Sequence, residues 1–204
     1  LAQVAESARQ LAEELTFRYP GIEAYLTGII MMNDAFPAAS KGDTELLFPI
    51  AAAIIGLLIY VFAGSLRIAF AIWTTVLASI VASVGIAGWL GIAMTPPTMA
   101  APIIILTLAV SDSIHIVAAY MDRKLAGRSD SAAMGESLPM NLMPVFVTSV
   151  TTVLGFLAMN FSDSPPFRDL GNIVAIGVLV AFGASILLLP QLILMLRPKP
   201  LQRA

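Results

Sequence analysis

The chain has 204 residues, of which 58% are hydrophobic and only 12% are charged, well below the charged fraction of about a quarter that soluble domains carry. This composition leaves too little polar surface to cover a globule, so lipid is expected to surround most of the chain. The net charge of −2 without a long basic run argues against nucleic acid as a partner, and the absence of cysteine excludes disulfides and thiolate metal sites.

The N-terminal part, residues 1–45, is predicted to be the end of a soluble α+β domain followed by a connector. Residues 1–19 have apolar side chains at helical spacing and are expected to form an amphipathic helix that ends at Pro20 and Gly21. Residues 22–28 alternate between apolar and polar side chains, which predicts a short strand. Because the chain starts without Met or a signal peptide, we expect it to be a segment of a longer protein.

Five apolar stretches follow, each with about the twenty residues that a helix needs to cross the hydrocarbon core. A polar linker at residues 122–141, expected to contain a short surface helix, and a tail at residues 197–204 lie outside them. The sequence therefore predicts an all-α polytopic membrane protein with a transmembrane bundle at residues 46–196. Its five spans are residues 46–66, 68–94, 101–121, 142–161 and 170–196.

The orientation of this bundle follows from its Lys and Arg residues, which favour the cytoplasmic side of a membrane. One set of span ends carries almost all of these cations, whereas the opposite short loops carry only Arg168. The linker and the C-terminal tail are therefore expected in the cytoplasm, and the N-terminal segment in the periplasm. The cations on the cytoplasmic side are Arg67, Arg123, Lys124, Arg128, Arg197, Lys199 and Arg203.

Two ionisable side chains lie inside the predicted spans, Asp112 and His115. Since they are three positions apart, they share one face of a helix. A charge at the middle of a bilayer costs about 2.5–3.5 kcal/mol even on permissive insertion scales. A helix this apolar does not need that cost in order to insert, so the sequence favours a functional Asp112 that binds and releases protons over a structural hydrogen bond.

The polar neighbours of Asp112 have two interpretations each. His115 either extends a proton relay with Asp112 or is a neutral side chain bonded to a carbonyl near the cytoplasmic end. Ser111 and Ser113 flank the carboxylate and either line the relay or donate to carbonyls of their own helix, which is the more common role of serine in membrane helices.

A second polar stripe is formed by Thr148, Thr151 and Thr152 in the fourth span, where helical spacing places them on one face with Gly155. Such a stripe is unusual for a surface that contacts lipid, so we expect it to turn inward and to line the relay at Asp112. The alternative is ordinary hydrogen bonding between helices, worth about 0.6 kcal/mol per bond.

Other chemistries find little support in the sequence. One His and one Asp inside the spans supply only two metal ligands, and neither a nucleophile elbow nor a phosphate-binding loop is present. We therefore predict no cofactor, no metal and no enzymatic activity, which leaves an ion gradient as the energy source.

The order of these features resembles one half of a resistance-nodulation-division (RND) superfamily exporter of the MMPL-type branch. The resemblance covers nearly the whole chain and rests on YLTG at residues 25–28, TPPTMAAP at 95–102, AVSDSIHI at 109–116, TSVTTVLGF at 148–156 and AIGVLVAFGAS before LLLP. It implies a half of six helices, of which the five spans are the second to sixth.

The resemblance also implies a role for Asp112, because such exporters cycle protons through an acidic residue on the fourth helix. It implies hydrophobic or lipid-like substrates and a second half, either in the same protein or in another copy. Many relatives have Asp followed by Tyr, where this chain has Ser113.

The sequence is thus interpreted as part of a proton-driven exporter in the inner membrane. The first alternative is a related protein-export or sterol-sensing-type accessory protein. The second is a structural or partner-binding membrane module in which Asp112 only bonds a neighbouring helix.

Overall fold

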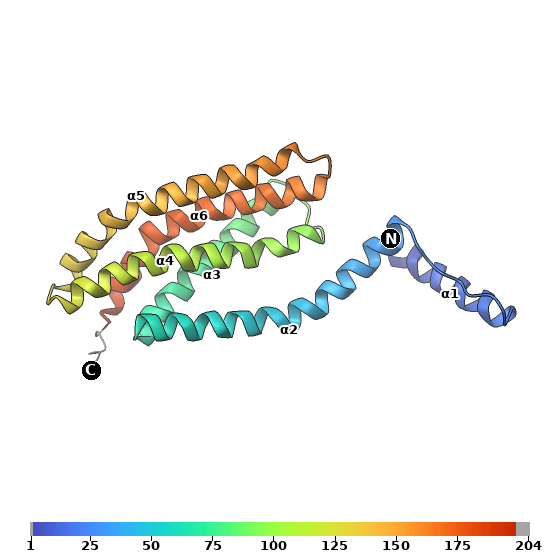
Figure 1. Cartoon of the computed structure of the whole chain (residues 1–204), viewed down its shortest axis with the longest axis horizontal. Helices are drawn as coiled ribbons and strands as arrows, with labels where there is room; N and C mark the ends of the chain where they lie inside the picture. Colours follow the sequence, from blue (N-terminus) through green and yellow to red (C-terminus); the bar gives the residue numbers. More distant parts are fainter. Residues whose placement is uncertain (1, 199–204) are drawn as a thin grey trace. The chain divides into compact units, whose positions relative to one another are not determined.

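The computed structural model describes residues 2–198, except for the side chains of residues 2, 33, 36–45, 47, 48 and 63. Within this part the chain is helical and contains no strand, which confirms the predicted all-α fold class (Figure 1). The α-helices are α1 (Ala2–Arg18), α2 (Ile29–Ala63), α3 (Leu66–Trp89), α4 (Ala101–Leu125), α5 (Asp130–Leu157) and α6 (Pro165–Leu196), with 3₁₀ turns η1 (Pro97–Ala100) and η2 (Ala158–Phe161).

The chain divides into two compact units, residues 1–51 and residues 52–204. In the first, α1 ends next to Pro20 and Gly21 as predicted, and Arg9 on α1 pairs with Asp34 on α2. The strand predicted at residues 22–28 is wrong, since residues 22–27 have neither helical nor strand structure. A strand needs a neighbour to accept its backbone hydrogen bonds, and the described residues supply none.

Four helical stretches are long and apolar enough to cross a membrane, and they contain the third to fifth predicted spans. They are Leu66–Trp89, Pro97–Leu125, Asp130–Phe161 and Pro165–Leu196. The second predicted span, residues 68–94, extends beyond its helix, which ends at Trp89. The first predicted span corresponds to a shorter apolar segment of α2, Pro49–Phe62. Its 14 residues extend over about 21 Å, less than the hydrocarbon thickness of about 30 Å, so a fifth crossing stays a prediction.

The polar linker is not a separate surface helix, contrary to expectation. After a turn at Gly127, whose φ is +84°, α5 begins at Asp130 and continues through Pro139 and Pro144 into the apolar span. A membrane helix tolerates proline because neighbouring helices and local adjustments satisfy the freed backbone groups. The N-terminus of α5 is capped by the Ser129 hydroxyl, which accepts from the Ala132 N–H at 3.3 Å.

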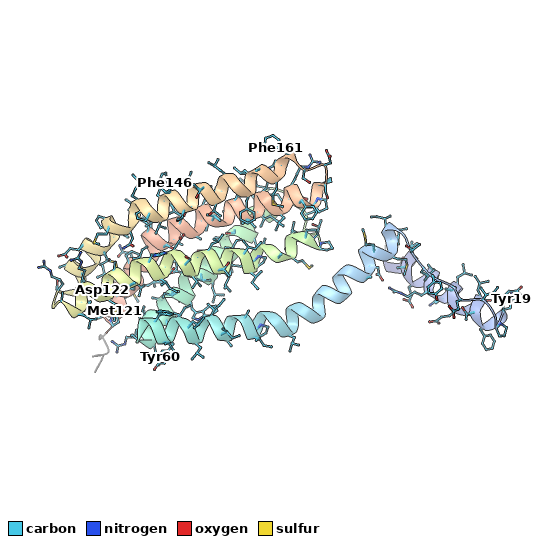
Figure 2. All side chains as sticks on the ribbon, viewed as in Figure 1. Tyr19, Tyr60, Met121, Asp122, Phe146 and Phe161 are labelled. Atoms are coloured by element: carbon cyan, nitrogen blue, oxygen red, sulfur yellow. The ribbon has the colours of Figure 1, made fainter. Side chains whose placement is uncertain are left out.

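The helices α3, α4 and α5 all pack against α6 (Figure 1). Two glycines of α6 permit this close approach. A Cβ atom at Gly171 would overlap the Phe156 carbonyl oxygen, and one at Gly177 would overlap the Ile105 side chain. Further along, the Phe146 ring, labelled on α5 in Figure 2, lies 5.9 Å from the Phe182 ring of α6.

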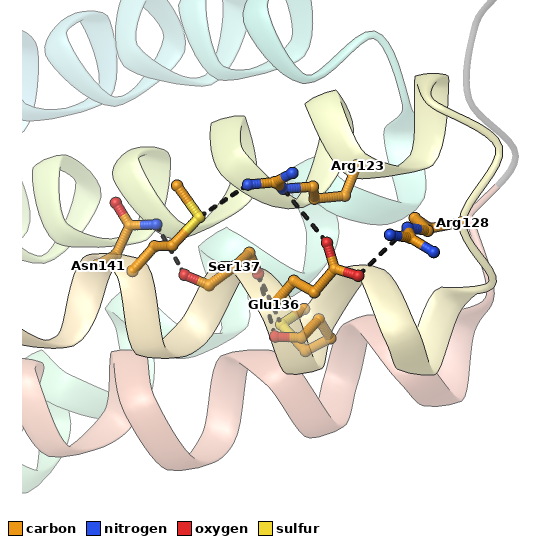
Figure 3. A network of polar contacts seen from close by, with 7 residues as sticks. Arg123, Arg128, Glu136, Ser137 and Asn141 are labelled. Atoms are coloured by element: carbon orange, nitrogen blue, oxygen red, sulfur yellow. Dashed lines mark hydrogen bonds and ion pairs between the residues drawn. The ribbon is translucent and has the colours of Figure 1, made fainter.

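Polar contacts hold together the turn between the end of α4 at Leu125 and the start of α5 at Asp130, here called the α4–α5 corner. The fully buried Tyr120 donates its hydroxyl to Asp130 at 2.7 Å, and Lys124 pairs with the same carboxylate at 2.8 Å. On the other side of the corner, Glu136 pairs with the guanidinium groups of Arg123 at 3.6 Å and Arg128 at 3.2 Å (Figure 3). These contacts fix the direction in which α5 leaves the turn.

The corner predicts a pH-dependent stability. Asp130 precedes the apolar part of α5, and Lys124 and Tyr120 hold the pKa of its carboxyl below the usual range. A lowered folded-state pKa gives stabilisation that is complete above the usual carboxyl pKa and is lost as the pH falls through the lowered value. We therefore expect the Tm difference between the chain and Asp130→Asn to be largest at neutral pH and to shrink in acid. Thermal unfolding in detergent measures it, and a constant difference down to about pH 2 would contradict the prediction.

Candidate functional site

Asp112 lies near the middle of α4, eleven residues after its start and thirteen before its end. These separations correspond to about 16 and 20 Å along the helix, so the carboxyl group lies near the middle of a helix that is long and apolar enough to cross a membrane. Its side chain is buried, with 8% of the residue exposed, and the nearby positions Ala109 and Ile116 are fully buried apolar residues. In the described part of the chain, no cation forms an ion pair with Asp112.

Besides His115 on the same helix, this carboxyl group has a second polar neighbour, Ser149 on α5. Ser149 is buried, and its hydroxyl has no hydrogen-bond partner that meets normal geometry among the described residues. A hydroxyl can donate to an ionised carboxylate and can accept from a protonated one. Asp112 and Ser149 together therefore form a pair that can accommodate both protonation states of the carboxyl group.

The serines beside Asp112 in sequence have other positions. Ser113 is fully buried and donates to the Ala109 carbonyl at 2.7 Å, so its hydroxyl is used within α4. Ser111 and His115 are exposed on the surface of the bundle, and His115 lies one turn beyond Asp112. Of these three residues, none directs a hydroxyl or imidazole hydrogen bond to Asp112 within the described structure.

The threonine stripe of α5 does not turn inward toward Asp112, contrary to expectation. Thr148 and Thr151 are exposed and Thr152 is half-buried. Their hydroxyls donate to carbonyls of α5 itself, from Thr148 to Val145 at 2.9 Å, from Thr151 to Val147 at 2.9 Å and from Thr152 to Thr148 at 2.7 Å. The buried face of α5 instead carries Val145, Ser149 and Val153 at four-residue spacing.

Ser149 is thus the site residue that the sequence prediction missed. It is adjacent to Thr148, but one position turns a helical side chain by about 100° and separates the two faces. The available signal was the alignment of Ser149 with two valines, because a small polar residue inside an apolar stripe points toward the core.

An exposed polar stripe also runs along α4, where Thr107, Ser111 and His115 follow one another at intervals of four. Thr107 donates to the Ile104 carbonyl at 2.8 Å, which leaves the imidazole as the strongly polar group of this face. Polar side chains at membrane depth usually face protein or water and seldom face lipid. As for metals, no three side chains of His, Asp or Glu gather within the described residues, so no ligand set can be assigned there.

Comparisons with known proteins agree with the features above. Residues 2–202 match the family described as the MMPL family. A protein of Methanocaldococcus jannaschii with the provisional name "membrane protein MJ1562" is 27% identical to this chain over 195 residues. The match covers 95% of this chain and 50% of that protein, so the chain spans about half the length of the curated relative that it matches.

Proposed function

Because this chain is a membrane protein of the MMPL family, we propose that it is part of an exporter of hydrophobic or lipid-like molecules driven by the proton-motive force. The observation that carries the proposal is a buried carboxyl group near the middle of a helix long and apolar enough to cross a membrane, without an ion pair in the described structure. Asp112 binds a proton from one side of the membrane and releases it to the other.

The chemistry of the site suits this role. Protonation removes a charge that is unfavourable at membrane depth, and deprotonation restores it next to the free hydroxyl of Ser149. The two states therefore differ in how strongly Asp112 attracts polar groups. Helix movements that follow this difference couple proton flow to transport. His115, one turn away, and the hydroxyl of Ser111 on the same helix provide polar groups through which protons reach the carboxyl group.

A second bundle is part of the proposal. The chain spans half of its curated relative, and its exposed polar side chains on α4 and α5 would be unfavourable against lipid. A second half of the same protein, or another copy, covers this face. We propose that the bundle lies in the inner membrane with the α4–α5 corner and the C-terminal tail in the cytoplasm, and the excess of Lys and Arg at these ends supports this orientation.

Carbodiimide labelling in liposomes tests the proton site without knowledge of the substrate, because a hydrophobic carbodiimide modifies protonated carboxyl groups buried in lipid. With the full-length protein, we expect labelling at Asp112 that changes between about pH 5 and 8. Mass spectrometry of the modified peptide locates the label, and Asp112→Asn removes it. Asp122→Asn is the matched control, since Asp122 is exposed at the end of the same helix and its loss should leave the signal unchanged.

Labelling at Asp112 that is absent, or constant across this range, would mean a carboxyl group fixed in one state. The structural alternative, in which Asp112 only bonds a neighbouring helix, would then replace the exporter.

A further inference from the structure

An apolar groove with one cation at its edge opens where the C-terminal part of α2, the start of α3 and the end of α6 meet. Its volume is about 620 Å³, which lies within the range of about 300–1,000 Å³ that small-molecule sites occupy. Aromatic side chains form much of its wall. We call it the α2–α3 groove, and its principal residues are Gly56, Tyr60, Arg67, Phe70, Trp73 and Leu196.

The cation, Arg67, uses only part of its hydrogen-bonding capacity on the protein. One terminal nitrogen of its guanidinium donates to the carbonyls of Leu196 at 3.2 Å and Arg197 at 3.1 Å, at the C-terminus of α6. A guanidinium has five N–H groups, so three are left, and the described residues supply no acceptor for them. Three N–H groups in a planar fork match the oxygens of a phosphate group.

The remaining wall is suited to a hydrocarbon chain. Arg67, Phe70 and Trp73 follow one another at three-residue spacing along one face of α3, so the groove runs for about 9 Å from the cation toward the membrane interior. Gly56 on α2 keeps this path open, because a Cβ atom there would lie 3.2 Å from the indole nitrogen of Trp73. Tyr60, labelled near the end of α2 in Figure 2, belongs with Trp73 to the aromatic residues typical of membrane interfaces.

The surrounding charge favours an anion. Arg197 follows directly after Leu196 of the groove and Arg67 bonds its carbonyl, although the charge of Arg197 also acts on the Asp130 carboxylate at the start of α5. Among the lining residues there is no carboxylate that could receive the cationic headgroup of a zwitterionic lipid. Basic pockets of this kind between membrane helices suit anionic headgroups.

We propose that the α2–α3 groove binds a phospholipid with an anionic headgroup from the leaflet at this end of the bundle. Its phosphate group accepts from the three free N–H groups of Arg67, and one acyl chain lies along Phe70 and Trp73. This site is separate from Asp112 and does not depend on proton coupling.

The two tryptophans of the chain provide an internal probe and control. Trp73 lines the groove, whereas Trp89 is 87% exposed at the other end of α3. We would place Trp89→Phe, which reports Trp73 alone, and Trp73→Phe, which reports Trp89 alone, in vesicles of phosphatidylcholine. Brominated phosphatidylglycerol or brominated phosphatidylcholine is then titrated over the same range of low mole fractions, and the quenching of fluorescence is measured at each.

We expect brominated phosphatidylglycerol to reach half-maximal quenching of Trp73 at a mole fraction about tenfold lower than brominated phosphatidylcholine does. Trp89 should be quenched equally by both lipids. In the Trp89→Phe background, Arg67→Gln should remove the difference at Trp73. Arg128→Gln should preserve it, because Arg128 lies at the α4–α5 corner and pairs with Glu136. Circular dichroism of each variant verifies that the bundle is folded.

Equal quenching of Trp73 by the two lipids would overturn the proposal, since the groove would then hold lipid without selecting its charge. Absence of quenching by either lipid would also overturn it, because a protein segment or a second copy would then fill the groove.

Discussion

Replacing Asp112 with Asn should abolish proton-coupled transport while leaving the protein folded. Asn has nearly the same size and can still form a hydrogen bond to a neighbouring helix, but it cannot bind and release a proton. In proteoliposomes of the full-length protein with an imposed pH gradient, substrate-stimulated proton flux should fall to the level of empty vesicles. A pH-sensitive dye trapped inside the vesicles measures this flux.

Two serine variants test whether proton flux depends on the hydroxyl that lies beside the Asp112 carboxyl group. Ser149→Ala removes the free hydroxyl beside the carboxyl group and should slow proton flux, whereas Ser113→Ala removes a hydroxyl already bonded to Ala109 and should not. Full flux in Asp112→Asn would show that the carboxyl group has no part in transport.

A single methyl group at Gly171 should strongly destabilise the bundle. The Cβ atom of Gly171→Ala would overlap the backbone carbonyl oxygen of Phe156 and approach the Met159 Cβ to 2.9 Å. Backbone atoms cannot rotate away, so α5 and α6 must separate. Overpacking of this kind costs about 1–3 kcal/mol, and we expect a clear decrease in the Tm of the protein in detergent.

Two glycines of the same helix give graded controls. Gly177→Ala would overlap the side chain of Ile105, which can change rotamer, so its effect should be smaller. Gly183 has open space at its Cβ position, and Gly183→Ala should leave the Tm unchanged or raise it slightly, since alanine favours the helix. Equal Tm values for Gly171→Ala and Gly183→Ala would contradict the predicted close contact between α5 and α6.

The sequence predicts the helical fold and the position of Asp112 well, for a physical reason. Long stretches without charge are incompatible with water, and one carboxylate inside such a stretch is conspicuous because of its cost. These signals are strong because the cost of placing each side chain in lipid can be judged from the residue alone. The packing neighbours of that residue do not need to be known.

Features that depend on partners were predicted less well. Whether Thr148 or Ser149 faces Asp112 depends on the rotation of α5 about its axis, which is fixed by packing against α4 and α6. The strand expected at residues 22–28 has the right alternation, but only a neighbouring strand would make it form. Likewise, the polar composition of the linker does not reveal that α5 is continuous, because Pro139 and Pro144 are tolerated inside the helix.

The bonds from Arg67 to Leu196 and Arg197 connect residues 129 and 130 positions apart. This separation has a consequence for biogenesis. During synthesis, α3 enters the membrane long before the end of α6 has left the ribosome, so the guanidinium of Arg67 spends that interval without its acceptors. The two bonds therefore cannot form before the end of α6 has been synthesised. A chain arrested before Leu196 cannot form them, so the start of α3 and the end of α6 stay unconnected.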